Sequence, residues 1–165
     1  MISEKTNEIQ KQNSATKDKF TKNLVKNQKL PSINKNKIFH WFLEFPEIFA
    51  NPKNVGFDIV IGNPPYIGYG SVSKEEKKLL KILFPEIYTG LNDYYYYFIW
   101  RTLQLLKNGG MGSLIVSRYF LEARYAQKLR EELLQNCYLD TLIDFKEYKI
   151  FPNHGINAII FFLLK

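Results

Sequence analysis

Apolar residues are concentrated after position 38, and their spacing predicts alternating strands and helices. Residues 57–61 form a short, largely β-branched apolar run, which predicts a strand buried on both faces of a sheet, and Gly62 then allows a sharp turn. Residues 113–117 and 138–145 predict two further strands. A last apolar run, residues 156–164, is expected to pair antiparallel with the strand before it.

Three segments have helical spacing, with apolar residues recurring every three or four positions. Because helical and strand segments alternate, the chain is expected to form an α/β sheet with helices on its faces. Asn108 and the two glycines after it are expected to end the second helix. The helical segments are residues 73–83, a segment from a cap at Asn92 or Asp93 to about Lys107, and residues 121–136.

Two segments precede the first strand. Residues 1–37 are rich in lysine and asparagine and poor in clustered apolar residues, which predicts a flexible leader. A basic arm on nucleic acid is the alternative. Residues 38–49 crowd aromatic side chains together, and because Pro46 limits a helix we expect an extended or turn-rich piece lying against the sheet. His40 and His154 are expected to be structural.

The formal charge is +7, from 23 Lys and Arg against 16 Asp and Glu, which favours a polyanionic partner such as nucleic acid. The single cysteine, Cys137, excludes an internal disulfide and fits a reducing cytoplasm. No apolar run reaches the roughly 18 residues that span a bilayer, and the N-terminus lacks the core of a signal peptide. We therefore expect a soluble, cytoplasmic protein with no membrane partner.

The turn Asn63-Pro64-Pro65-Tyr66 follows the first strand, and ligands of open parallel sheets bind beyond the carboxyl ends of the strands. Two prolines fix two φ angles, so the Pro64 carbonyl and the Asn63 side chain can form a rigid acceptor pair for an amino group. Such a pair would favour the pyramidal amino nitrogen and prepare it to attack an electrophilic carbon, with no metal required. Tyr66 adds a face for stacking. A purely structural Pro-Pro turn remains the alternative.

This motif and the strand before it resemble the catalytic motif of amino-group methyltransferases that use S-adenosylmethionine, particularly N6-adenine DNA methyltransferases. The aromatic block at residues 39–49 is similar to the segment that precedes this motif in type II restriction-modification enzymes whose methylase and nuclease share one chain. The resemblance implies a partial methyltransferase catalytic domain over residues 38–165, with the C-terminal half of a Rossmann-like sheet. Its downstream pattern is matched at residues 105–110, 117–121, 129–130 and 143–145.

The resemblance also implies roles for single residues. Asn63, Pro64, Pro65 and Tyr66 would form the catalytic turn, with Asn63 and Pro64 binding the adenine N6 amino group and Tyr66 stacking on the flipped base. Phe151 is expected on the other face of the base, and Phe145 is the alternative. The aromatic residues at 94–98 lie on a predicted helix, so they are expected to be core and helix-face residues and not to stack on the base.

In family members with this order of motifs along the chain, a glycine-rich cofactor loop precedes the catalytic turn. In this chain the residues before the turn are mainly those of the leader. Residues 109–112 are a poor substitute, because they lie between a helix and the strand that follows it. We therefore expect S-adenosylmethionine as cofactor with its main motif outside this chain, and as partners DNA and a second polypeptide that binds the cofactor. No separate DNA-reading domain is expected before Lys165.

Two alternatives to an adenine methyltransferase remain open from the sequence. One is an inactive remnant of a split restriction-modification gene, which keeps the motif without activity. The other is an amino-group methyltransferase of a different substrate, because protein-glutamine and guanine-N2 RNA enzymes present a similar turn.

Overall fold

A computed structural model describes residues 39–50, 55–151 and 155–165 of the chain. The chain divides into two compact units, Met1–Pro52 and Lys53–Lys165. The predicted leader lies outside the described residues. Within the described ranges, no helix combines the length and apolarity needed to cross a membrane.

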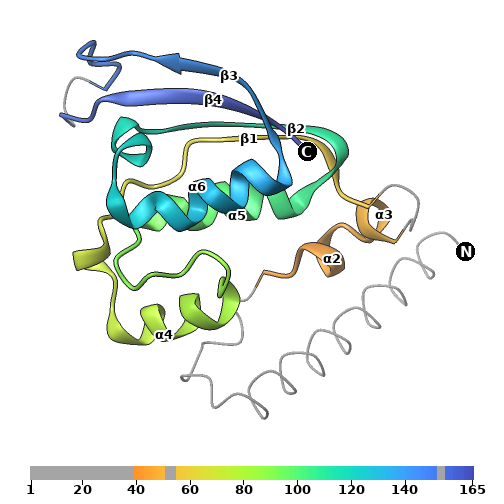
Figure 1. Cartoon of the computed structure of the whole chain (residues 1–165). Coiled ribbons are helices and arrows are strands. Elements are labelled where there is room, and N and C mark those ends of the chain that lie inside the picture. The colour runs from red at the N-terminus through yellow and green to blue at the C-terminus, as the bar shows by residue number, and fades with distance from the viewer. Residues whose placement is uncertain (1–38, 51–54, 152–154) are drawn as a thin grey trace, which may run out of the picture. The chain divides into compact units, whose positions relative to one another are not determined.

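The described part of the first unit contains two short helices, α2 (Trp41–Glu44) and α3 (Pro46–Phe49), shown in orange in Figure 1. Of the extended or turn-rich piece expected here, the extended conformation is therefore not observed, and the chain forms two short helical turns instead. Pro46 is the first residue of α3, where its missing N–H breaks no intrahelical hydrogen bond and its fixed φ suits the helix. The aromatic rings of this unit pack on one another, with the Phe42 and Phe49 centroids 4.6 Å apart.

The second unit is built on a four-stranded sheet with the spatial order β1-β2-β4-β3. β1 and β2 are parallel, whereas β4 is antiparallel to both of its neighbours. The predicted antiparallel pairing of the last two strands is thereby confirmed, and β4 also pairs with β2. The strands are β1 (Phe57–Gly62), β2 (Leu106–Ser117), β3 (Tyr138–Asp144) and β4 (Ala158–Leu164).

The three predicted helices are present as α4 (Lys74–Leu83), α5 (Tyr94–Leu105) and α6 (Gln127–Asn136). α4 begins at a capping box, in which Ser73 and Glu76 bond each other's backbone N–H groups. Figure 1 shows α5 and α6 along one face of the sheet. The core lies between these helices and the strands, and includes Ile99, Leu103, Leu129, Leu114, Val116, Ile159 and Phe161.

Two predicted boundaries differ from the structure. α5 ends at Leu105 and β2 starts at the next residue, so the predicted helix stop at residues 108–110 lies inside a strand. The close approach of β1 explains this, because a Cβ at Gly110 would lie 2.8 Å from the Phe57 carbonyl oxygen. Short 3-10 helices at Arg118–Leu121 and Arg124–Ala126 occupy the first part of the predicted third helix, so α6 begins later.

The strand at residues 57–61 was expected to be buried on both faces, and this is wrong. Ile59 and Ile61 pair with Met111 and Ser113 and therefore lie on the same face of the sheet as they do. Ile59 is 66% exposed and Ile61 is 76% exposed. Among the described strands of this unit β1 lies at the edge, and helices α5 and α6 pack on the opposite face, so neither helix covers Ile59 and Ile61.

Replacing Ile61 by lysine is expected to lower self-association without unfolding the protein. The exposed side chain loses little buried area, so the free energy of unfolding should change by no more than about 0.5 kcal/mol. A charge on an edge strand opposes pairing between edges. Light scattering against concentration checks the effect, with Ile159→Lys as the buried control that should unfold. Unchanged association of a folded Ile61→Lys variant would exclude this face as the contact surface.

Candidate functional site

The site begins where β1 ends, at the carboxyl edge that it shares with the parallel strand β2. Gly62 was expected to turn the chain sharply, but it is the last residue of β1 and pairs with Leu114. Its small size matters instead, because a Cβ there would lie 3.2 Å from a methyl carbon of Leu114. The turn itself therefore starts at Asn63.

The Pro-Pro turn leaves its asparagine exposed. Asn63 and Pro65 are exposed, while Pro64 is buried. Within the described part of the chain, no hydrogen bond is observed to the Asn63 side chain or to the Pro64 carbonyl. The local hydrogen bond that a purely structural turn would give Asn63 is therefore not seen there, and neither acceptor has a partner among the described residues.

Tyr66 fixes the turn to the sheet. Its hydroxyl donates a hydrogen bond of 3.2 Å to the carbonyl oxygen of Ile115, on β2. Its ring lies 6.4 Å from the Tyr95 ring and 6.3 Å from the Phe151 ring, measured between centroids. Partial burial raises the pKa of the Tyr66 hydroxyl, so this group stays protonated and remains a donor. One face of the turn is thus held by β2 and an aromatic cluster.

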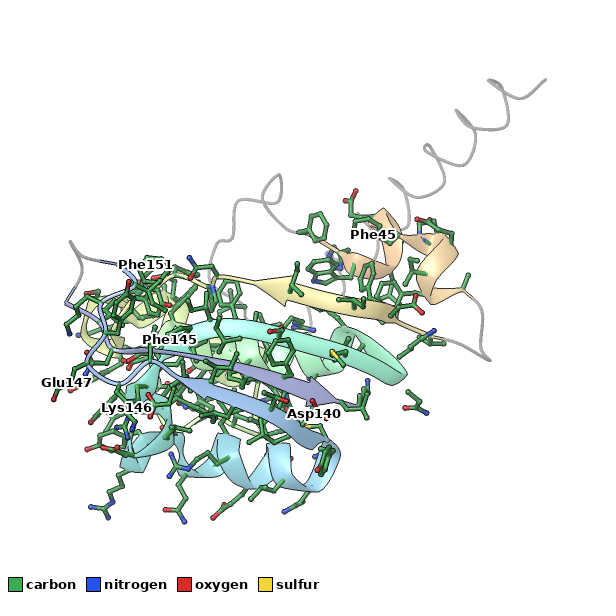
Figure 2. The ribbon with its side chains drawn as sticks, turned by 90° about the horizontal axis from the view of Figure 1, so that it is seen from above. Phe45, Asp140, Phe145, Lys146, Glu147 and Phe151 are labelled. Atoms are coloured by element: carbon green, nitrogen blue, oxygen red, sulfur yellow. The ribbon has the colours of Figure 1, made fainter. Side chains whose placement is uncertain are left out.

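The two aromatic residues considered as partners of Tyr66 lie at the same end of the sheet (Figure 2). Phe151 contacts the Tyr66 ring, whereas no ring contact between Phe145 and Tyr66 is seen among the described residues. The Tyr66 and Phe151 rings are inclined by 59° at 6.3 Å. A base stacked between two parallel rings needs about 7 Å between them, twice a contact distance of about 3.5 Å. The two rings are therefore too close and too inclined for a third ring to lie between them in this structure.

A pocket of about 180 Å³ opens beside the turn. Asp93, immediately before α5, is half-buried and accepts a hydrogen bond of 3.1 Å from the Tyr69 N–H instead of capping the helix. Burial raises the pKa of this carboxyl group, and the Tyr69 N–H partly opposes the shift. The pocket is lined by Tyr66, Ile67, Gly68, Asp93, Tyr95, Ser117 and Ile156.

Tyr95 is a residue of this site that the sequence pattern assigned to the core. It is only 2% exposed, as a core residue would be, yet it is one of the residues that line the pocket, and its hydroxyl is buried. The hydroxyls of Ser117 and Tyr96 are polar neighbours, but neither meets hydrogen-bond geometry. Its position two residues after Asp93, at the start of a helix at the carboxyl edge, is the signal in the sequence that could have found it.

Arg118 links the end of β2 to the end of β3. It follows β2 directly, and its Nε donates a hydrogen bond of 2.9 Å to an oxygen of Asp144, the last residue of β3. It also pairs with Glu122. The Lys146 N–H and then Arg118 lower the pKa of Asp144, so the carboxylate stays ionised at neutral pH. This pair fixes the end of β3, from which the chain leads to Phe151.

The glycine-rich run at residues 109–112 forms no nucleotide loop. Residues 109–112 lie within β2, where Met111 and Gly112 pair with β1 and β4, so this run is part of a strand and not a strand-to-helix loop. Gly110 and Gly112 would place a Cβ 2.8 Å from the Phe57 carbonyl oxygen and 2.7 Å from a Thr102 methyl carbon. These glycines therefore allow close packing and offer no cradle for a nucleotide.

Known proteins have sequences similar to this one. The family model of the Eco57I restriction-modification methylase matches residues 2–151. The type II methyltransferase M.HincII of Haemophilus influenzae is 34% identical over 111 residues, which are 66% of this chain and 22% of that protein. The type II restriction enzyme and methyltransferase RM.Eco57I of Escherichia coli is 32% identical over 115 residues, 68% of this chain and 11% of that protein. The chain thus matches about a tenth of the length of RM.Eco57I and about a fifth of the length of M.HincII.

A solved structure shares the fold. A Listeria monocytogenes protein described as a class I S-adenosylmethionine-dependent methyltransferase superposes with a TM-score of 0.52 at 20% identity, covering 67% of this chain and 32% of that one. This likeness confirms the predicted fold class, an α/β sheet of the class I methyltransferase type. Together with the family match, the sequence and the sheet show that the chain belongs to the Eco57I restriction-modification methylase family.

Proposed function

We propose that this chain carries the catalytic turn of a type II DNA methyltransferase that methylates the N6 amino group of adenine. The observation that carries the proposal is the exposed Asn63 side chain beside the Pro64 carbonyl, both without a described partner, at the carboxyl edge of a methyltransferase-type sheet. Family membership supports methyl transfer to DNA, because M.HincII and RM.Eco57I are named as type II methyltransferases.

The turn acts on the amino group by accepting its two hydrogens. In the proposed complex, Asn63 Oδ1 and the Pro64 carbonyl oxygen each accept one N–H of the exocyclic amine. This arrangement draws the nitrogen lone pair out of conjugation with the ring and directs it toward the methyl donor. S-adenosylmethionine supplies the methyl group when it is bound, and the residues of this chain orient the acceptor.

The base must leave the duplex to reach this turn, because a stacked base keeps its amino group within the helix. Tyr66, fixed by its bond to Ile115, offers one aromatic face. Phe151 offers the other after turning from its inclined contact with Tyr66. Closed aromatic packing in the free protein then protects apolar surface that the flipped base covers on binding.

The proposal includes a second polypeptide that carries the cofactor-binding half. Two features support it: the glycine-rich run at residues 109–112 belongs to β2 instead of a nucleotide loop, and β1 lies at the edge of the described sheet with Ile59 and Ile61 exposed. A strand added to β1 would extend the sheet, and a helix above it would bury these side chains. The partner's surface is expected to be apolar.

The test combines the chain with the product of the adjacent upstream reading frame and measures transfer of tritiated methyl groups. We expect label in DNA and, after digestion, N6-methyladenine. N4-methylcytosine would overturn the adenine assignment, label in protein alone would overturn the DNA assignment, and no label at all would favour an inactive remnant. Calorimetry with the chain by itself should detect no binding of S-adenosylmethionine.

A further inference from the structure

The face of the sheet that α5 and α6 leave uncovered is apolar across all four described strands. We call it the open face, and strand register defines it, because paired residues point to the same side of a sheet. Three rows of paired residues cross it, and none of the three contains a charged side chain. Its large exposed side chains, with exposed fractions from 37% to 76%, are Ile59, Ile61, Met111, Tyr138, Ile143 and Leu164.

The middle row marks the centre of the open face. Ser113 on β2 and Phe162 on β4 pair with each other there, between Ile61 on one outer strand and Thr141 on the other. Ser113 and Phe162 are partly buried by their neighbours. Covering these rows desolvates no ion, so the burial of apolar area is not opposed by the cost of burying a charge.

The exposed part of the open face is large enough for a stable interface. With about 150–200 Å² for a fully exposed large side chain, its six exposed residues present on the order of 500–650 Å². The partly buried residues between them add to this area, and a standard interface buries about 800 Å² on each partner. An apolar patch of this size is typical of an interaction site.

The width of the open face decides what can cover it. Four strands about 4.8 Å apart span roughly 14 Å between the axes of the outer two, whereas a helix is about 10 Å wide. One helix therefore covers only part of the face. A second sheet of the same width covers all of it, at the separation of about 10 Å that packed sheets adopt. A copy of the open face meets this requirement.

Pairing along the outer edge of β3 would be another mode of association, and this strand opposes it. Asp140, labelled in Figure 2, lies at the register irregularity between Leu139 and Thr141. Its carboxylate accepts a hydrogen bond of 2.9 Å from the Thr141 hydroxyl. An irregular edge strand with a charge is a poor template for a further strand. Association is therefore favoured at the face and not at this edge.

We propose that two copies of this chain form a symmetric homodimer in which their open faces pack on each other. Both copies contribute the same patch, so a two-fold axis crosses the interface. In this dimer the axis passes near the middle row, and Ser113 of one copy lies close to Ser113 of the other. The second polypeptide of the proposed function also covers Ile59 and Ile61, so its binding displaces one copy.

Sedimentation velocity of the full chain over a wide range of concentration tests the dimer. We expect an equilibrium between monomer and dimer with no larger species. Ser113→Lys places two like charges near the axis and is expected to weaken the dimer at least about 100-fold. Leu134→Lys is the matched control, because Leu134 is 79% exposed on α6, on the other side of the sheet, and should leave the dimer unchanged.

Mixing two variants tests the symmetry. Ser113→Glu alone should be as weak a dimer as Ser113→Lys, whereas an equimolar mixture of the two should associate more tightly than either. Ser113 lies on an inner strand of the described sheet, so this rescue reports on the face and not on an edge. If circular dichroism shows that the Ser113 variants are unfolded, Tyr138→Lys replaces a 65% exposed side chain of the same face and should also weaken the dimer.

Four outcomes would overturn the inference: a wild-type chain that stays monomeric, growth beyond the dimer, equal weakening by Leu134→Lys, or folded Ser113 variants whose mixture associates no more tightly than each alone. None of these measurements uses DNA or a methyl donor. A failed dimer therefore leaves the proposed function intact, and an inactive enzyme leaves the dimer intact.

Discussion

Replacing Asn63 by alanine is expected to slow methyl transfer by the assembled enzyme about 100- to 1,000-fold. This range is typical for the loss of one preorganised polar group that acts on the reacting centre. Asn63 accepts a hydrogen of the amino group in the proposed complex, and without it the nitrogen lone pair stays conjugated with the ring. Because the side chain is exposed, the free energy of unfolding should change by no more than about 0.5 kcal/mol.

The measurement is the single-turnover rate with tritiated methyl donor and saturating DNA. Asn108→Ala is the matched control, since Asn108 is also exposed but lies in β2, outside the site. A rise in KM with an unchanged kcat would contradict the prediction, because it would mean that Asn63 binds substrate and transition state equally. A wild-type rate of methyl transfer in Asn63→Ala would show that the Asn63 side chain takes no part in the reaction.

Replacing Gly56 by alanine is expected to lower the free energy of unfolding by about 3–5 kcal/mol, from a left-handed φ combined with overpacking. Gly56 has φ +119°, and an added Cβ would lie 2.5 Å from the Lys107 nitrogen and 2.6 Å from the Leu106 carbonyl carbon. Both atoms belong to the backbone where α5 passes into β2, so they cannot move without disturbing the sheet. The loss is a large share of the 5–15 kcal/mol that is typical of a domain.

Urea denaturation of the variant gives the free energy directly. Gly70→Ala is the matched control, because an added Cβ there meets no atom within 4 Å and should leave stability nearly unchanged. A loss below about 1 kcal/mol for Gly56→Ala would show that the junction of α5 and β2 can shift to make room.

The periodic parts of the fold were predictable from sequence because their apolar spacing reflects one buried face. α5 has Ile99 and Leu103 facing the sheet, and β4 alternates through Ile159 and Phe161. The predictions that were wrong concern features that depend on contacts with residues far away in the sequence. Residues 108–110 are an asparagine and two glycines, which commonly end a helix. They lie in β2 instead, because β1 packs closely against Gly110.

The burial of β1 shows the same limit. An apolar β-branched run is typical of a central strand, but Ile59 and Ile61 are exposed because the order of strands puts β1 at an edge. That order is a property of the whole sheet and cannot be read from six residues.

The candidate site was predictable only in part. The acceptor pair at Asn63 and Pro64 follows from local chemistry, since prolines fix the backbone wherever they occur. The pocket could not be found in this way, because Tyr95 and Ser117 meet Tyr66 only after the sheet has formed. A tyrosine in a helical pattern is ordinarily a core residue, and the place of Tyr95 on the wall of the pocket is set only in the folded chain.

The order of the strands has a consequence for how the chain folds. β3 and β4 are consecutive in the sequence and pair directly, whereas β1 and β2 pair across the intervening α4 and α5. Closing the longer loop costs more chain entropy, so we expect β1 to join the sheet after the β3 and β4 hairpin has formed. The turn that follows β1 then contacts Ile115 and its aromatic neighbours only in the last step of folding. A chain in which β1 has not yet joined the sheet therefore lacks the assembled turn and cannot bind a base there.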